Sequence, residues 1–223
     1  MSYYPILVEL KGKNVVVVGG GVVAQRKIDT LLECGAVVHV ISKELTPVLQ
    51  RYVDSGKIRS LGHEFEESYL QDSFLVIAAT SDPVLNHRIS KIAQERKMLV
   101  NVVDQPSDCN FIIPSIMKRG DLLIAVSTSG KSPALAKKLR EKLTGQFGRE
   151  YEDFLILMGK LRKEILSRGL AQEENSTIFH ELVDSPILEA LSRKDWKAIA
   201  LNINKILHTR ISHDDVTKYL KVE

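Results

Sequence analysis

The chain has 223 residues, of which 44% are hydrophobic and 26% charged, as in ordinary globular proteins with one large domain or two smaller ones. The formal net charge is only +3, and basic residues are scattered among acidic ones, which argues against a nucleic-acid-binding surface. The two cysteines, Cys34 and Cys109, are too few for a disulfide scaffold, and neither they nor the six histidines have the spacing of a metal site. No secretion signal and no apolar run of roughly 20 residues is present, so we expect a cytoplasmic protein that binds neither membrane nor metal.

The first half of the chain alternates short apolar runs with longer segments of helical periodicity. This alternation is typical of βα units that build a parallel sheet. The predicted strands are Asn14–Val18, Val37–Ile41, a short one near Ile58–Leu61, Phe74–Ala78, Leu99–Val103 and Leu122–Ser127. The predicted helices between them are Val22–Cys34, which ends at Gly35, and Pro83–Arg96.

The pattern changes after residue 133. A basic helix is predicted over Ala134–Leu143, and we expect Gly145 and Gly148 to end it. From Tyr151 onward every pattern is helical, over Tyr151–Arg168, Ser176–Val183, Pro186–Leu191 and Trp196–His208. A boundary into an all-helical region therefore lies near Phe147–Glu150.

The most informative motif follows the first predicted strand. Read as G-x-G-x-x-A, it begins at Gly19, which permits a tight turn, and continues to Gly21, where a backbone without a side chain can approach a pyrophosphate. Ala24 then lets the following helix pack closely on the sheet, with its N-terminus directed at the phosphates. This arrangement predicts a dinucleotide-binding site.

Polar residues follow the second and third major strands. In dinucleotide sites an acidic residue at the end of the second strand binds the ribose, and here that strand runs into Ser42, Lys43 and Glu44. Ser42 or Glu44 could bind a ribose hydroxyl, whereas Lys43 could accept a 2′-phosphate, so the loop leaves NAD and NADP open. After Ala78, we interpret Thr80 as a cofactor contact and Asp82 as the cap of the helix that begins at Pro83.

The strand Leu99–Val103 brings Asn101 and Asp104 to the same edge of the sheet. A carboxylate beside a nicotinamide could take up a proton while hydride leaves the substrate, although a turn aspartate before Pro106 is an equally good interpretation. Further along, the hydroxyl-rich loop Ser127–Pro133 could hold a carboxylate or phosphate. Its structural alternative is a helix start, with Ser132 before Pro133.

Several segments carry a family resemblance: Tyr4–Ile6, Val18–Lys27, Ala78–Asp82, Asn101–Asp104, Phe111–Ser115 and Ala125–Ala134. Together they resemble the precorrin-2 dehydrogenase and sirohydrochlorin ferrochelatase family of sirohaem biosynthesis, also found as the N-terminal part of sirohaem synthases. The resemblance implies NAD-dependent oxidation of precorrin-2 to sirohydrochlorin, with iron insertion to sirohaem as a possible second activity. It also implies a catalytic role for Asp104 as general base or proton acceptor.

The fold implied is an N-terminal Rossmann-like parallel sheet over residues 1–113, a small dimerisation segment over 114–147 and a helical domain over 148–223, in a homodimer. The predicted cofactor contacts are Gly19, Gly21, Val22, Val23, Ala24, Ser42, Lys43, Glu44, Thr80 and Val103. The predicted substrate contacts are Asn101, Ser127, Thr128, Ser129 and Lys131. Because the tetrapyrrole substrate is a polycarboxylate, Arg26, Lys27, Arg88 and Lys137 are further candidates.

A second hypothesis from another class stands beside the enzyme. The chain could be a non-enzymatic NAD-sensing module whose helical tail docks on a partner. Tight NAD binding without tetrapyrrole binding or turnover would favour it.

Overall fold

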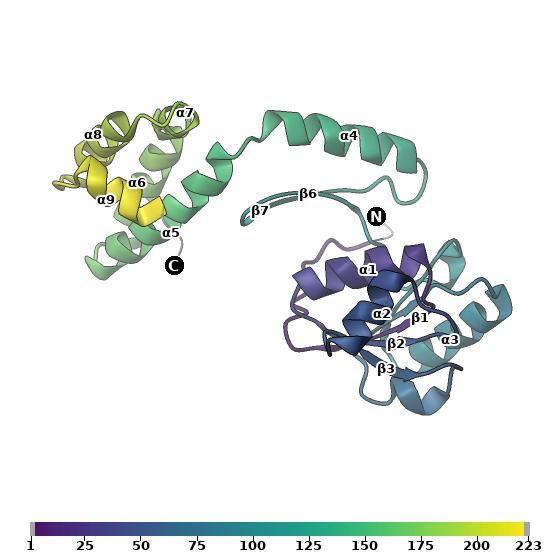
Figure 1. The fold of residues 1–223 in the computed structure, drawn as a ribbon. Helices are drawn as coiled ribbons and strands as arrows, with labels where there is room; N and C mark the ends of the chain where they lie inside the picture. The colour runs from purple at the N-terminus through teal and green to yellow at the C-terminus, as the bar shows by residue number, and fades with distance from the viewer. Residues whose placement is uncertain (1–2, 221–223) are drawn as a thin grey trace. The chain divides into compact units, whose positions relative to one another are not determined.

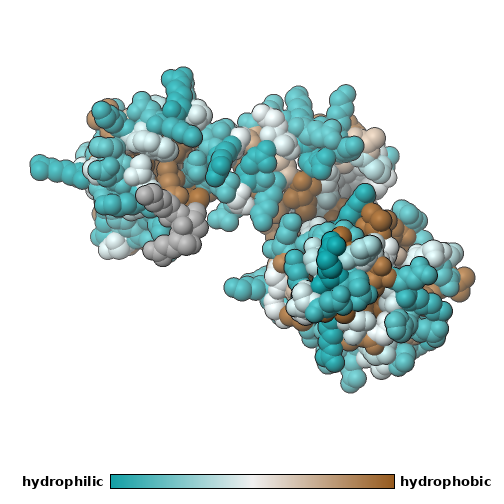
Figure 2. Space-filling model, in the orientation of Figure 1, coloured by the Kyte–Doolittle hydropathy of each residue, from teal (hydrophilic) through white to brown (hydrophobic). Residues whose placement is uncertain are grey.

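The computed structural model describes residues 3–220. The chain divides into two compact units, with the division between Ile113 and Pro114 (Figure 1). No helix among the described residues is both long and apolar enough to cross a bilayer. The visible surface of each unit is largely hydrophilic, with local apolar patches (Figure 2).

The first unit contains a five-stranded, fully parallel sheet with the strand order β3-β2-β1-β4-β5. The strands are β1 (Asn14–Val18), β2 (Val37–Ile41), β3 (Arg59–Gly62), β4 (Leu75–Ala78) and β5 (Leu99–Val102). The helices are α1 (Val22–Glu33), α2 (Pro47–Asp54) and α3 (Pro83–Glu95), with short 3₁₀ turns η1 (Glu67–Leu70) and η2 (Pro106–Asp108). The Rossmann-like parallel sheet predicted from the sequence is confirmed.

Alternating residues of the central strand β1 face two different layers. Val15 and Val17 pack with Ile28 of α1 and with Leu49 of α2, whereas Val16 and Val18 pack on the opposite face with residues of α3. Strands buried on both faces read as continuous apolar runs, which is why Val15–Val18 is unbroken valine. The sheet is therefore covered on both sides, and its carboxyl edge is left for a ligand.

The outer edge of β5 is occupied by the chain segment that follows η2. The amide of Val100 donates to Asn110 Oδ1 at 2.8 Å, and Val100 O accepts from the Asn110 amide at 3.1 Å. The amide of Val102 donates to Cys109 Sγ at 3.1 Å, and that thiol donates to Val102 O at 3.3 Å. Side chains and backbone of this segment thus complete the hydrogen bonding of the last strand.

The second unit begins with an antiparallel hairpin of β6 (Ser115–Arg119) and β7 (Leu122–Val126). The strand predicted over Leu122–Ser127 is present as β7, but it pairs antiparallel with β6 and does not join the parallel sheet with which the sequence pattern grouped it. Arg119 pairs with Leu122, so the strands are joined by the two-residue turn Gly120-Asp121, with Gly120 at φ +53°. Such a short connection permits only an antiparallel pair.

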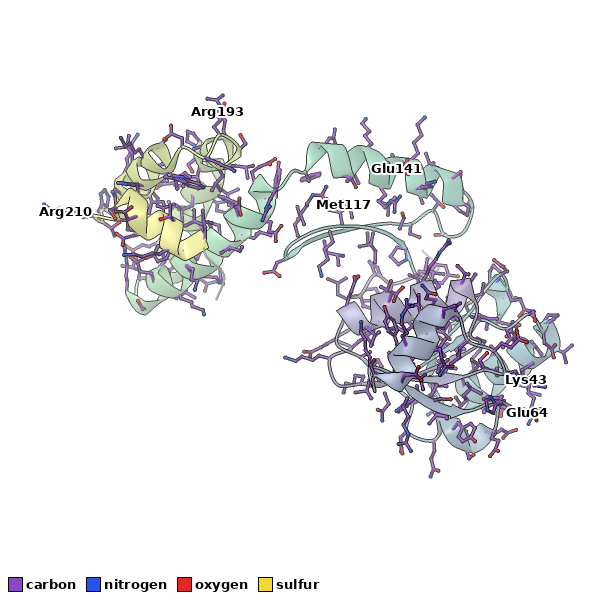
Figure 3. All side chains as sticks on the ribbon, viewed as in Figure 1. Lys43, Glu64, Met117, Glu141, Arg193 and Arg210 are labelled. Atoms are coloured by element: carbon purple, nitrogen blue, oxygen red, sulfur yellow. The ribbon has the colours of Figure 1, made fainter. Side chains whose placement is uncertain are left out.

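Helix α4 (Pro133–Gln146) lies against this hairpin and continues through Gly145, which we expected to end it. The last turn persists because Arg119 of β6 supplies donors to its end: Nη2 donates to Thr144 O at 3.2 Å and Nε to Phe147 O at 3.0 Å. Met117, 2% exposed, lies on the α4 side of the hairpin (Figure 3).

The remaining helices are α5 (Glu150–Ser167), α6 (Gln172–Asp184), α7 (Ile187–Ser192), α8 (Trp196–Leu207) and α9 (His213–Leu220). They share a core in which Leu157, Leu161, Leu182, Ile199 and Ile203 are fully buried. The all-helical C-terminal region is confirmed. Its division from residues 114–147 as a separate domain stays a prediction.

Candidate active site

A cleft of about 970 Å³ lies at the carboxyl edge of the parallel sheet, lined by residues that follow each of the five strands. Ligands of open α/β sheets bind at this edge. The lining includes all but one of the predicted cofactor residues and the predicted catalytic aspartate: Gly19, Gly21, Val22, Val23, Ser42, Lys43, Glu44, Thr80, Val103 and Asp104. The exception, Ala24, is completely buried where α1 packs on the sheet.

The glycine turn between β1 and α1 has a different neighbour at each position. Gly19 has φ +122°, and a Cβ there would overlap the carbonyl group of Ala79. A Cβ on Gly20 would overlap the carbonyl oxygen of Glu44, whereas a Cβ on Gly21 would meet no atom within 4 Å. The first two glycines therefore allow close backbone packing, and the third keeps the cleft open at the start of α1.

The N-terminus of α1 has free backbone donors. Gly21 is the N-cap and provides no side-chain hydrogen bond, and the first amide bonded back to it is that of Gln25. The preceding amides of the first turn carry the positive end of the helix dipole. Together with the open position at Gly21, they can accept an anionic group such as a pyrophosphate.

The loop after β2 is built onto the glycine turn. The Ser42 hydroxyl donates to Glu44 O at 2.7 Å, and the Thr46 amide donates to Gly20 O at 3.0 Å. Lys43 Nζ lies 3.1 Å from Glu64 Oε1, a residue that follows β3. The cleft wall is thus continuous from the glycine turn across β2 to β3.

At the end of β4, Thr80 is held by the first turns of α3. Its Oγ1 lies 2.7 Å from Asn86 Oδ1, and Asn86 Nδ2 donates to Thr80 O at 3.1 Å. Asp82 Oδ1 accepts from the amides of Val84 and Leu85 at 2.9 and 3.1 Å, which confirms the interpretation of Asp82 as a helix cap. Asn86, only 3% exposed, was not singled out in the sequence, because its partner becomes visible only when β4 and α3 meet.

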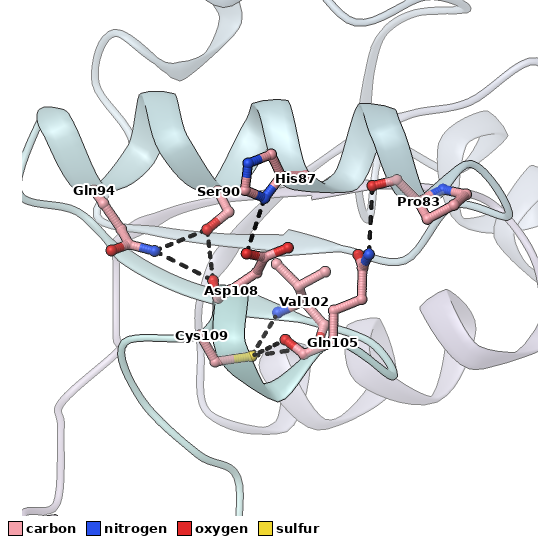
Figure 4. Close-up of polar contacts among 8 residues, drawn as sticks. All are labelled: Pro83, His87, Ser90, Gln94, Val102, Gln105, Asp108 and Cys109. Atoms are coloured by element: carbon pink, nitrogen blue, oxygen red, sulfur yellow. Dashed lines mark hydrogen bonds and ion pairs between the residues drawn. The ribbon is translucent and has the colours of Figure 1, made fainter.

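Asp104 projects from the end of β5 with a left-handed backbone, φ +59°, and is exposed in the cleft. The chain is fixed on both sides of it. Before it, the Val103 amide donates to Ala78 O at 2.9 Å. After it, Asp108 is tied to α3 by His87 at 3.0 Å and by the Ser90 hydroxyl on its carbonyl at 2.5 Å (Figure 4). Aspartate is among the residues other than glycine that adopt this conformation most readily, and the hydrogen bonds on either side hold the chain there.

Asn101 lies off the cleft. Its Nδ2 donates to Phe111 O at 3.2 Å, which ties β5 to the end of the first unit. Ser127, Thr128, Ser129 and Lys131 lie in the second unit. There Ser132 Oγ accepts from the Leu135 amide at 3.2 Å, which confirms the helix-start interpretation of this loop. Contact of any of these residues with substrate stays a prediction.

The basic candidates have different surroundings, and none of them lines the cleft. Arg88 is paired with Glu67 at 2.9 Å, and Lys137 with Glu141 at 3.9 Å. Arg26 is exposed. Lys27 is half-buried, and this desolvation lowers the pKa of its ammonium group, partly offset by Cys109. Among residues 3–220, no three His, Cys, Asp or Glu side chains are grouped as a metal site would need.

Sequence reasoning missed the cleft residues that follow β3, which are His63, Glu64 and Phe65, and also Leu45, Thr46 and Leu85. The signal for the first three was present, since a short strand near Ile58–Leu61 was predicted and residues after parallel strands meet at one edge. The others depend on how α2 and α3 begin, which a strand pattern does not reveal.

A parallel sheet, a glycine turn leading into a helix and a cleft at the carboxyl edge define a Rossmann-like dinucleotide-binding protein. Two family models match the chain: a putative NAD(P)-binding family over residues 6–115 and the central region of sirohaem biosynthesis proteins over residues 119–146. The chain belongs to the family of precorrin-2 dehydrogenases and sirohaem synthases, as the following relatives also indicate.

The siroheme synthase of Photorhabdus laumondii is 41% identical over 181 residues, which are 81% of this chain and 38% of the relative. The siroheme synthase of an Escherichia coli O139:H28 strain is 34% identical over 214 residues, 96% of this chain and 47% of the relative. The chain thus spans less than half the length of these relatives. Among solved structures, SirC, a precorrin-2 dehydrogenase, superposes with a TM-score of 0.76 at 26% identity, over 93% of this chain and all of SirC.

Proposed function

We propose that this protein oxidises precorrin-2 to sirohydrochlorin with NAD as the oxidant. One observation carries the proposal: the glycine turn and the exposed Asp104 line the same cleft at the carboxyl edge of the sheet. The likeness to SirC over that protein's whole length supports it, because SirC is described as a precorrin-2 dehydrogenase.

The residues present fit a dinucleotide. Gly21 leaves open space where a side chain would stand, and the first amides of α1 are free to bind a pyrophosphate. Thr80 and Val103 line the cleft at the ends of β4 and β5, on the Asp104 side of the glycine turn. When bound there, NAD would supply the hydride acceptor.

The oxidation removes a hydride and a proton from the substrate, and the chain has a group for the proton. Asp104 is exposed in the cleft, and its backbone is anchored by Ala78 on one side and by α3 on the other. An exposed carboxylate on an anchored segment of backbone is available in the cleft to accept that proton. Its role is general base.

The test is a coupled assay. Purified protein with precorrin-2 and NAD should produce NADH absorbance and sirohydrochlorin. An Asp104→Asn variant, which keeps the shape but cannot take up the proton, should lose about 10²–10⁴-fold in kcat. Asp72→Asn, an exposed change in the same unit, serves as the matched control. Normal turnover by the Asp104 variant would make that residue structural and the mechanism wrong.

Iron insertion is a separate prediction of the family resemblance, with ferrous ion as a substrate. It is tested by supplying sirohydrochlorin and ferrous ion to the same preparation. Oxidation without insertion would define a dedicated dehydrogenase. NAD binding without precorrin-2 turnover would instead favour the sensing module.

We also propose that residues 114–147 join two copies of the chain into a homodimer. On the hairpin, Ile116 and Leu123 are each 39% exposed, and Ala125, the partner of Ile116 in the register, is exposed beside them. A two-stranded sheet is marginal alone and gains stability when an apolar face is covered. A second hairpin of the same kind would cover it.

A further inference from the structure

An ion pair between residues that follow two neighbouring strands lies in the wall of the cleft. Lys43 follows β2 and Glu64 follows β3, and their side chains meet at 3.1 Å although 74% and 77% of each is exposed (Figure 3). Both residues line the cleft, together with His63 and Glu44. The pair therefore belongs to the wall of the proposed NAD site.

The end of the second strand is where dinucleotide sites distinguish their cofactors. An acidic residue there binds the ribose 2′-hydroxyl of NAD, whereas a cation there accommodates the 2′-phosphate of NADP. This chain has a lysine in that loop, which by itself would favour NADP. The neighbouring strand end, however, supplies the carboxylate that engages the lysine.

The charge balance of this wall opposes a second phosphate. Lys43 contributes one positive charge, and Glu44 and Glu64 contribute two negative charges. A 2′-phosphate would have to displace Glu64 from Lys43 and then remain beside both carboxylates. A ribose hydroxyl meets no such repulsion and can donate a hydrogen bond to a carboxylate.

We propose that Glu64 is the residue that selects NAD over NADP, by occupying Lys43 and by repelling the 2′-phosphate. The inference rests on the proposed function, since it concerns the same cofactor site. The acid that excludes the 2′-phosphate thus comes from the end of β3, next to the lysine that follows β2. Specificity is a difference between two affinities, and here it is set by a repulsive group.

The side chains are exposed, so removing the pair does not threaten the fold. Exposed ion pairs contribute little to stability. Glu64→Gln keeps the size of the side chain, removes its charge and leaves Lys43 free. Glu66→Gln is the matched control, because it makes the same charge change on an exposed residue two positions away that does not line the cleft.

The experiment measures the dissociation constants of NAD and NADP by calorimetry for the whole protein, each variant and the double variant Lys43→Gln/Glu64→Gln. Glu64→Gln should tighten NADP binding about tenfold, as expected for removing a unit charge a few Å from a dianion near water. NAD binding should stay within about threefold. The double variant should lose this gain in NADP affinity, because it lacks Lys43, the residue that would receive the 2′-phosphate.

Failure of the inference about Glu64 and failure of the proposed function give different results in this experiment. If the unaltered protein binds NAD but Glu64→Gln leaves the NAD to NADP ratio unchanged, or if Glu66→Gln shifts it equally, the inference is wrong and the proposed function stands. If the unaltered protein binds neither nucleotide, the proposed function itself fails.

Discussion

The glycines of the β1–α1 turn differ in what surrounds them. Gly19 needs its left-handed φ, Gly20 is pressed against the carbonyl oxygen of Glu44, and Gly21 faces open space. The motif predicted the first role, which the structure confirms. It did not predict the second, because the loop after β2 that crowds Gly20 is remote in sequence.

Gly21→Ala should separate binding from folding. The backbone at Gly21, φ −79°, suits any residue, so the free energy of unfolding should fall by less than about 1 kcal/mol. The added methyl would stand where a pyrophosphate approaches, so NAD affinity should fall at least tenfold. Calorimetry and thermal unfolding on the same sample measure both. An NAD affinity that does not change would contradict the phosphate site at this turn.

Gly20→Ala should lower the free energy of unfolding more than Gly21→Ala does. Its Cβ would overlap Glu44 O, so the turn and the 42–46 loop must move apart, at a cost of about 1–3 kcal/mol. Denaturant unfolding followed by far-ultraviolet circular dichroism gives the value. Gly145→Ala, with open space around it inside α4, is a control that should be neutral or stabilising.

At the scale of elements, apolar periodicity predicted the central strands and the long helices. The turn and helix-cap residues that define the short elements were not used. Helix α2 was not predicted, although Thr46 before Pro47 is a helix start and Thr46 Oγ1 accepts from the Leu49 amide. The turn Gly120-Asp121 signalled a hairpin, but β7 resembles a core strand when its partner is ignored. Short elements are specified by such turn and cap residues more than by periodicity.

Arg119 should be the main link between the hairpin and α4. Arg119→Ala removes charge-assisted hydrogen bonds to Thr144 O and Phe147 O, and we expect a loss of about 1–3 kcal/mol. Hydrogen exchange of the β7 and α4 amides measures the local effect. Lys142→Ala, an exposed change on α4 away from the hairpin face proposed to join two copies, should change little. Equal exchange in both variants would show that the link is unimportant.

The stability of helix α9 should depend on pH because of the carboxyl group of Asp215. Its carboxylate accepts the hydroxyl and the amide of Ser212 at 2.6 and 3.0 Å, and these hydrogen bonds lower its pKa. Because the folded pKa lies below the unfolded one, the stabilisation is present above about pH 4 and is lost as the pH falls through the folded value.

Asp215→Asn should therefore loosen the first turn of α9 at neutral pH. It should also make the stability of α9 depend less on pH in the acid range. Circular dichroism melts between about pH 2 and 7 give the comparison. Asp214→Asn, a neighbouring exposed carboxylate, should leave the transition in place. A transition of the same shape in the Asp215 variant would rule out this group as its origin.

At the scale of the whole molecule, the proposed homodimer predicts that a charge placed in the interface halves the mass of the protein in solution. Leu123→Lys places a charge on the outer face of the hairpin, which a second copy would have to bury, so the protein should sediment as a monomer. Leu201→Lys, 70% exposed on α8, should leave the mass unchanged. A dimer that tolerates Leu123→Lys would place the interface elsewhere.

The completed edge of β5 has a consequence for assembly. A sheet whose last strand keeps free amides and carbonyls can continue into a neighbouring molecule, strand upon strand, and such growth leads to aggregates. Here Asn110 and Cys109 already hold the outward groups of Val100 and Val102. The β5 edge of the sheet is therefore closed by the side chain and backbone of Asn110 and by the thiol of Cys109. Even at high protein concentration, copies of the chain should not extend the sheet at this edge.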